Sequence, residues 1–340
     1  MIPWFSVWEA KVSGFVQRME GRVLGSTRVR RRLSGVIGFI GRLLIFTGFS
    51  FIILYPMLYM LSVGFRQADD MADPMVIWIP KHLTLENIQD AFRLMDYPTS
   101  LRNSVTLGVV SSLLQILSCA LVGYGFARFE FKGKRLLFAL VLFTIIVPPQ
   151  VIYAPTYLSY KAFDFFGLGQ IGRLFTGEAF TVNILNTGFS LYLPALLGVG
   201  IRSGLFIYIF RQFYRGLPYE LEDAAYIDGC GFFRTFFRVI LPNASAALLT
   251  VFLFSIVWYW NDYYYIAMYF SSTKTVSMAL SLLPDALVTN KATQALSGDP
   301  YLIGTRLQAG ALLAITPLLI LYLFLQRYFT QGFERTGLTG

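Results

Sequence analysis

One polar segment of this apolar chain combines acidic side chains with turn residues. Pro218 opens it, and a run of carboxylates and alanines precedes the turn pair Asp228-Gly229. Acidic residues suit the positive end of a helix dipole, and proline is tolerated in a first helical turn. The pattern predicts a short helix from about Pro218, placed in water to contact another molecule, with Leu221, Ala224 and Ala225 sharing one face. The residues of this helix, its turn and its exit are Glu220, Leu221, Glu222, Asp223, Ala224, Ala225, Asp228, Gly229, Leu241 and Pro242.

A second amphipathic stretch follows directly. Beyond Gly231, aromatic and aliphatic residues recur at helical spacing, with Arg234 and Arg238 on another face. This period predicts a helix that lies against the bilayer or the helical bundle and leads through Leu241-Pro242 into the next apolar stretch. From periodicity alone, the whole segment could equally be an interfacial hairpin that only connects two spans.

Other residues could contact a polar ligand at membrane depth. Arg202 lies inside an apolar stretch, where a charge is unfavourable and usually faces a cavity or a partner. It could contact an anionic sugar, pair with a carboxylate of a partner subunit, or snorkel to the interface. A second group combines flat rings with hydrogen-bonding groups, which suits a sugar, although such residues also collect at interfaces without a ligand. These residues are Trp258, Trp260, Asn261, Asp262 and Tyr263.

Several other chemistries find no support in the residue types. The single histidine, His82, lies outside the apolar stretches, and no metal site is predicted. No nucleophilic Ser-His-Asp or Cys-His set and no glycine-rich phosphate loop is recognisable, so we expect neither an enzyme nor ATP hydrolysis by this chain. Cys119 and Cys230 lie in different kinds of segment, and no disulfide is predicted.

Apolar stretches dominate the 340 residues. Hydrophobic residues make up 56% of the chain and charged residues 14%, compared with roughly 25% charged residues in soluble domains. The alternation typical of barrel strands is missing. About 20 apolar residues cross a bilayer as a helix, so the sequence predicts an all-α, polytopic membrane protein with six transmembrane helices. Their ranges are 43–64, 103–126, 136–158, 190–213, 241–264 and 307–326.

Lysine and arginine predict the orientation. They are about twice as frequent in the segments on the side of the N-terminus, which places both termini and the 214–241 loop in the cytoplasm. The net charge of +9 then favours contact with anionic lipid, not nucleic acid. We predict a basic cytoplasmic arm at 1–42, a membrane domain at 43–328 and a cytoplasmic tail at 329–340. Pro148-Pro149 and Pro317 should break or kink their helices.

The polar loop resembles a motif of a known family. Asp223-Ala224-Ala225, Gly229 and Val239-Ile240-Leu241-Pro242 are similar in type and spacing to the E-A-A-x3-G-x9-I-x-L-P loop of permease subunits in bacterial ATP-binding-cassette importers. Asp223 stands where Glu is usual, and Val239 where Ile is usual. The flanking segments look like the carbohydrate branch, similar to the shorter maltose-type permease. They include Leu83-Thr84-Leu85-Glu86-Asn87, Gly123-Tyr124-Gly125-Phe126-Ala127-Arg128 and Trp260-Asn261-Asp262.

The resemblance implies a type I importer permease fold, in which the 214–241 loop forms a coupling helix that docks on an ATPase subunit. It also implies a second homologous permease, two ATPase subunits that bind ATP and Mg, and an extracytoplasmic solute-binding protein. This chain would hold no cofactor. The implied function is uptake of a carbohydrate, an oligosaccharide, through the bacterial inner membrane by alternating access. The alternative is an ion-gradient-driven secondary transporter, which would use intramembrane carboxylates, scarce here apart from Asp262.

Overall fold

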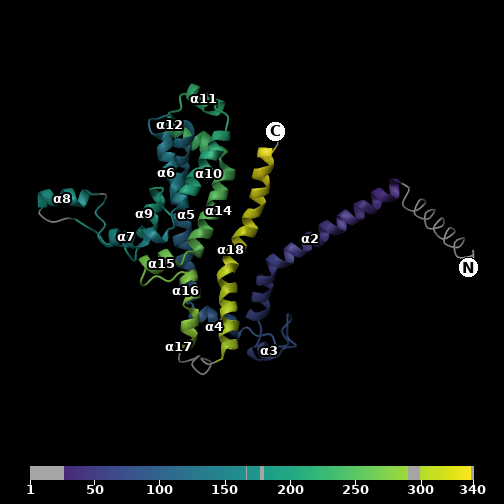
Figure 1. Cartoon of the computed structure of the whole chain (residues 1–340). Coiled ribbons are helices and arrows are strands. Elements are labelled where there is room, and N and C mark those ends of the chain that lie inside the picture. Colours follow the sequence, from purple (N-terminus) through teal and green to yellow (C-terminus); the bar gives the residue numbers. More distant parts are fainter. Residues whose placement is uncertain (1–26, 166, 177–179, 290–298, 338–340) are drawn as a thin grey trace, which may run out of the picture. The chain divides into compact units, whose positions relative to one another are not determined.

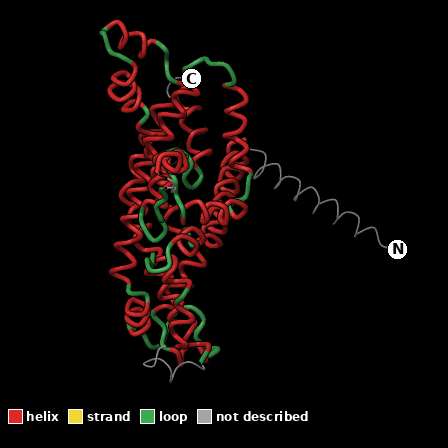
Figure 2. The backbone as a smooth tube through the Cα atoms, turned by 90° about the vertical axis from the view of Figure 1, so that its left-hand side faces the viewer, coloured by secondary structure: helices red, strands yellow, loops and turns green. Residues whose placement is uncertain are grey.

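The computed structural model describes residues 27–165, 167–176, 180–289 and 299–337. Apart from two isolated bridges, these residues form helices, turns and loops, and Figure 2 shows no strand among them. This confirms the predicted all-α class. The chain divides into two compact units, Met1–Ser62 and Val63–Gly340. Residues 1–26 of the predicted N-terminal arm and the last three of the predicted C-terminal tail lie outside the described ranges.

The first unit consists, in its described part, of most of helix α2 (Thr27–Gly64). Its Gly35–Gly64 part is apolar enough to cross a membrane, and most of its side chains are exposed. The ring of Tyr55 contacts those of Phe51 and Tyr59 along the helix. A helix that is apolar all round needs lipid or another apolar surface around it. The first predicted span, 43–64, lies within α2.

Helix α5 (Tyr97–Arg128) is the centre of the second unit. It packs against α9 (Phe189–Leu196), α10 (Ser203–Gly216) and α14 (Ser245–Asn261). Most of the side chains that α5 buries are small or polar. Small residues let helices approach closely in a membrane, where lipid removes the usual hydrophobic driving force for packing.

Two residues of α5 show how this close packing works. An added Cβ at Gly123 would lie 2.7 Å from the side chain of Phe210 on α10, so only glycine fits without a shift. Buried Gln115 donates hydrogen bonds to the carbonyl oxygen of Ile201 (2.6 Å) and to Ser203 Oγ (2.8 Å). Together these contacts fix the start of α10 against α5.

Three described helices are long and apolar enough to cross a membrane. They are Gly35–Gly64 of α2, Tyr97–Arg128, and Pro300–Arg327 of α18 (Pro300–Gly337). The predicted spans 103–126 and 307–326 lie within the second and the third of these helices. Pro317 lies inside α18 without ending it.

Two further predicted spans are bent pairs of helices. α6 (Lys134–Ile146) and α7 (Gln150–Lys161) meet at 103° across Pro148-Pro149, where a helix cannot continue unbroken. The stretch Phe232–Asn243 meets α14 at 79°. If each bent pair is one span, the described residues contain up to five spans.

The predicted span 190–213 is not one continuous helix. α9 ends at Leu196 and α10 begins at Ser203. Between them, Gly198 (φ 72°) and Arg202 (φ 59°) have left-handed backbone conformations, which interrupt a right-handed helix. The stretch is apolar on both sides of the break, which favoured one continuous span, although Gly198, Gly200 and Gly204 are residues typical of turns. The six-span count stays a prediction.

The two ends of the second unit differ (Figure 1). The end that we call the α11 end holds α11 (Glu220–Ile227), α12 (Phe232–Thr235) and the C-terminal end of α18. From α12 the chain continues through a π-helical turn, Phe236–Ile240, and α13 (Leu241–Asn243) into α14. The opposite end, the α4 end, holds α3 (Ala68–Ala72), α4 (Glu86–Leu94), α16 (Val276–Ser281) and α17 (Leu283–Thr289). The remaining helices are α8 (Leu168–Thr176) and α15 (Tyr264–Tyr269).

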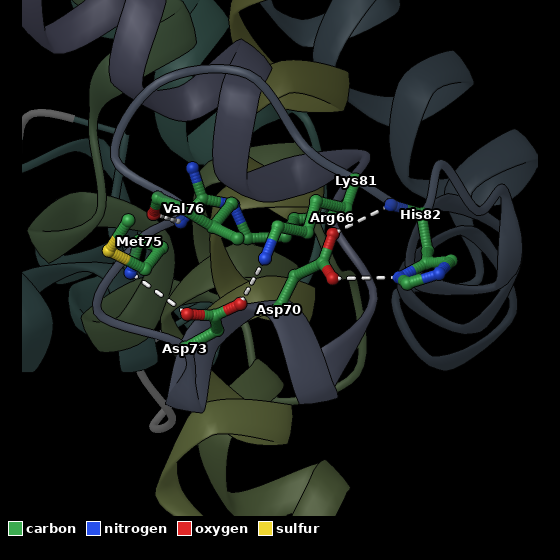
Figure 3. Close-up of polar contacts among 7 residues, drawn as sticks. All are labelled: Arg66, Asp70, Asp73, Met75, Val76, Lys81 and His82. Atoms are coloured by element: carbon green, nitrogen blue, oxygen red, sulfur yellow. Dashed lines mark hydrogen bonds and ion pairs between the residues drawn. The ribbon is translucent and has the colours of Figure 1, made fainter.

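A polar network folds the segment between α2 and α4 (Figure 3). Buried Arg66 donates hydrogen bonds to the carbonyl oxygens of Val76 (3.1 Å) and Ile77 (3.0 Å). Asp70 Oδ2 accepts a hydrogen bond from the backbone N–H of His82 (2.7 Å), and its Oδ1 lies 2.9 Å from His82 Nδ1. The backbone hydrogen bond from His82 is the main cause that lowers the pKa of Asp70. The segment is therefore a fixed structure at the α4 end.

Candidate functional site

Helix α11 has an inner and an outer face. The inner face packs on α12 and the π-helical turn, with Glu222 and Ala225 buried and Leu221 half-buried. Of the three residues predicted to share one face, Ala225 is buried and Leu221 half-buried, whereas Ala224 lies at the exposed edge of that face. The outer face is exposed and carries Glu220, Asp223, Ala224 and Ile227, the last of which is 86% exposed.

A buried ion pair holds the inner face. Arg128, the last residue of α5, places Nε 2.6 Å from Glu222 Oε1, and the two side chains are 2% and 9% exposed. Arg128 Nη2 also donates a hydrogen bond to the carbonyl oxygen of Leu217 (2.8 Å), and its guanidinium lies 4.1 Å from the ring centroid of Tyr219. We call the pair of Arg128 and Glu222 the clasp. Glu222, predicted in the contact helix, is therefore engaged within the chain.

An aromatic cluster lies beneath the clasp. Tyr124 of α5 is fully buried and contacts four rings from neighbouring elements. Aromatic pairs of this kind contribute about 0.5–1.5 kcal/mol each beyond the area that they bury. The cluster joins α5, α10 and α12 below α11. The four rings and their centroid distances from Tyr124 are Phe129 (5.9 Å), Tyr214 (5.6 Å), Phe232 (5.6 Å) and Phe236 (5.2 Å).

The turn after α11 is a Schellman motif. Gly229 N donates to the carbonyl oxygen of Tyr226 (3.0 Å), and Cys230 N donates to that of Ala225 (2.9 Å), which is the hydrogen-bond pattern of this cap. Gly229 has a φ of 76°, and no atom lies within 4 Å of an added Cβ. Glycine is therefore favoured by backbone conformation and not by crowding. The turn predicted at Asp228-Gly229 is present.

The structure does not bring all the predicted pathway residues together. Trp260 is only 5% exposed and donates its Nε1 hydrogen to the carbonyl oxygen of Ala314 in α18 (3.1 Å). Asn261 Nδ2 donates to a carbonyl oxygen of its own helix (3.0 Å). Asp262 Oδ1 accepts a hydrogen bond from Tyr265 N (2.7 Å). The polar groups of these three residues hold the end of α14 in place.

Arg202 and Trp258, in contrast, meet. The guanidinium carbon of Arg202 lies 4.5 Å from the ring centroid of Trp258, which is 39% exposed. Among the described residues, no carboxylate oxygen lies within 4 Å of the Arg202 guanidinium. Tyr263 is also partly exposed, and its ring contacts that of Tyr264.

Two cavities adjoin each other at the connection between α9 and α10, and Arg202 lines the larger one. The larger, of about 340 Å³, is lined by residues of α6, α7, α10 and the connection between α9 and α10, with Tyr265 from α15. The smaller, of about 210 Å³, lies next to it. The two share Ile152, Val199, Gly200 and Tyr265. Within the described ranges as a whole, no group of three or more His, Cys, Asp or Glu side chains is placed to hold a metal ion.

Sequence reasoning missed three residues of the α11 end as site residues: Arg128, Tyr219 and Ile227. An arginine at the end of an apolar helix indicates membrane orientation, and nothing local connects Arg128 to a glutamate far along the chain. The sequence indicated only weakly that Ile227 is exposed, through its position directly before the Asp228-Gly229 turn.

A helical membrane protein with a firmly held, exposed polar helix at one end has the architecture of a subunit that docks on another protein. A family model described as binding-protein-dependent transport system inner membrane component matches residues 119–335. The match covers the clasp, α11 and Arg202. The chain belongs to this family.

Two curated relatives and one solved structure are similar over most of the chain. The arabinooligosaccharides transport system permease protein AraQ of Halalkalibacterium halodurans is 29% identical, over 87% of this chain and 94% of that protein. The lactose transport system permease protein LacG of Rhizobium radiobacter is 29% identical, over 73% of this chain and 78% of that protein. One similar structure is a chain from the crystal structure of a bacterial ABC transporter involved in the import of the acidic polysaccharide alginate. It matches with a TM-score of 0.66 at 20% identity, over 88% of this chain and 98% of that chain. That likeness shows a shared fold.

Proposed function

We propose that this chain is a permease subunit of an ATP-binding-cassette importer and forms half of the transmembrane pathway for a carbohydrate. Its family, its fold and its relatives in arabinooligosaccharide and lactose transport support this class. The chain works with a second homologous permease and two ATPase subunits, which bind ATP and Mg. A solute-binding protein delivers the sugar. The permease lies in the bacterial inner membrane with both termini in the cytoplasm.

The outer face of α11 is the observation that carries the coupling role. Glu220 and Asp223 are exposed and form no ion pair within the described part of the chain. Exposed Ile227 lies on the same face, and Ala224 leaves room for close backbone approach. An apolar anchor with carboxylates around it fits a cleft that has an apolar floor and a basic rim. The proposed occupant of this face is the ATPase subunit.

The clasp makes α11 a rigid lever. Because Arg128 connects α11 to α5, and α5 packs against α9, α10 and α14, a displacement of α11 also moves the core of the unit. In the proposed cycle, ATP closes the ATPase pair, the two coupling helices move together and the pathway opens outward. Hydrolysis in the ATPase subunits returns the pathway to the inward-open state.

The test is uptake by the purified transporter, reconstituted with its partners in liposomes. Asp223→Lys reverses a charge on the outer face and should reduce ATP-dependent uptake by about tenfold or more, because like charges then meet at the ATPase. Glu86→Lys is the matched control, since Glu86 is also exposed in the first turn of a short helix, but at the α4 end. It should leave the binding of the ATPase subunits unchanged, whereas Asp223→Lys should weaken that binding.

An ion-gradient-driven transporter gives a different outcome. Its uptake would survive Asp223→Lys and the removal of ATP, and it would stop when an ionophore dissipates the gradient. That combination of results would refute the importer assignment.

A further inference from the structure

Arg202 occupies an unusual place for an unpaired charge. It lies between α9 and α10, within a stretch predicted to cross the membrane, and the described residues place no carboxylate oxygen within 4 Å of it. An unpaired charge at membrane depth is unfavourable, and such residues usually face a cavity or a counter-charge. The chain itself supplies the cavity.

Tight packing imposes the conformation of this connection. A Cβ at Gly200 would lie 2.7 Å from Tyr259 Oη, and one at Gly204 would lie 2.3 Å from Thr144 Oγ1. Arg202 lies between these two closely packed glycines and has a left-handed conformation, with a φ of 59°, which L-residues with a side chain rarely adopt. Strained residues of this kind cluster at functional sites.

The cavities beside Arg202 have the chemistry of a sugar site. The larger one, of about 340 Å³, lies within the usual range of ligand cavities, about 300–1,000 Å³. Arg202 is the charged residue among its lining residues, which are all described; the others are apolar, small or hydroxyl-bearing. The smaller cavity adds the hydroxyl groups of Thr156, Ser190 and Tyr259. Apolar walls and hydroxyls suit the CH faces and OH groups of a sugar, and the guanidinium adds selection for an anion.

We propose that Arg202 binds the carboxylate of an acidic sugar, a uronic acid unit, in this cavity. The inference rests on the proposed function as a carbohydrate importer and names its substrate class. A planar guanidinium matches a carboxylate through two parallel hydrogen bonds. The Trp258 ring lies 4.5 Å from the guanidinium carbon, and an aromatic face provides no hydrogen-bond acceptor as strong as a carboxylate, so this contact does not replace a counter-charge. A carboxylate of the second permease is the other possible counter-charge, and the experiment separates the two.

The experiment compares two sugars on the complete purified transporter, without the binding protein. Trigalacturonate is the acidic probe, and its fully methyl-esterified form is the neutral probe of the same length. Binding is followed by tryptophan fluorescence. The wild type should bind the acidic probe about tenfold more tightly, and rising salt should reduce this difference. Arg202→Asn should remove the difference by weakening only the acidic probe, and asparagine tolerates the left-handed backbone, so the variant should fold.

Arg102→Asn is the matched control, because Arg102 is exposed on α5 and lines neither cavity. It should leave both affinities unchanged. Equal affinity of the wild type for both probes, no binding of either probe, or unchanged discrimination in Arg202→Asn overturns the proposal. Loss of the second permease from the Arg202→Asn complex also overturns it, since the counter-charge is then a partner carboxylate. ATP-driven uptake of a neutral oligosaccharide in any of these cases leaves the importer function intact.

Discussion

Removing one partner of the clasp should release α11 from α5. Arg128→Met keeps most of the side-chain length but leaves the Glu222 carboxylate buried without its counter-charge. Breaking a buried ion pair in this way costs about 3–5 kcal/mol. Glu222 lies in a short helix at the end of the unit, where opening of α11 lets its carboxylate reach water. We therefore take the lower value and expect Arg128→Met to lower the free energy of local opening of α11 by about 3 kcal/mol.

Amide hydrogen exchange of the purified transporter measures this opening. A change of about 3 kcal/mol corresponds to roughly hundredfold faster exchange in α11, while exchange in α9 should be unchanged. The double variant, Arg128→Met with Glu222→Met, should exchange close to the wild-type rate, because an apolar pair of similar size replaces a buried ion pair at little cost. Wild-type exchange in Arg128→Met, or a double variant as fast as the single one, would refute the clasp.

Three other outcomes can be checked on the same protein. Gly229→Val should destabilise the turn after α11 by about 1–2 kcal/mol because of its positive φ, whereas Gly229→Asn should be tolerated; equal amide exchange in both variants would contradict this. Because the folded pKa of Asp70 is lowered, mainly by the backbone hydrogen bond from His82, its contribution to stability is present above the ordinary value of 3.8 and is lost as the pH falls through the folded pKa. Amide exchange of residues 65–85 should show this loss, and Asp70→Asn should reduce the pH dependence to the part due to Asp73, whose pKa is lowered mainly by its hydrogen bond with Lys81. A cysteine at exposed Tyr219, in a cysteine-free background, should react with an impermeant thiol reagent only from the cytoplasmic side, and labelling of intact cells from outside would refute the topology.

The features that sequence predicted well depend on local rules. Proline and carboxylates indicated the start of α11, and Asp228-Gly229 indicated its Schellman turn, because dipole, capping and backbone freedom act within a few residues. The break across Pro148-Pro149 was predictable for the same reason. Composition was sufficient for the helical membrane class, since lipid leaves few alternatives to helices.

The features that the sequence did not predict depend on contacts between distant residues. Glu222 and Asp223 are neighbouring carboxylates, yet one is buried against Arg128 and the other is exposed. No local rule separates them, because the partner lies at the end of another helix. The break before α10 was missed because the apolar length of 190–213 outweighed its glycines, whereas the close packing of Gly200 and Gly204 against other helices could not be read from the sequence.

The sharp bend between α6 and α7 has a consequence for biogenesis. The two helices have 13 and 12 residues, so each extends for no more than about 20 Å at 1.5 Å per residue, whereas the hydrocarbon core is about 30 Å thick. No side chain of α6 is fully buried, and its packing partner α10 lies later in the chain. Neither half can cross the bilayer alone as it leaves the ribosome. We therefore expect this part of the chain to enter the membrane late, after α10 has been synthesised.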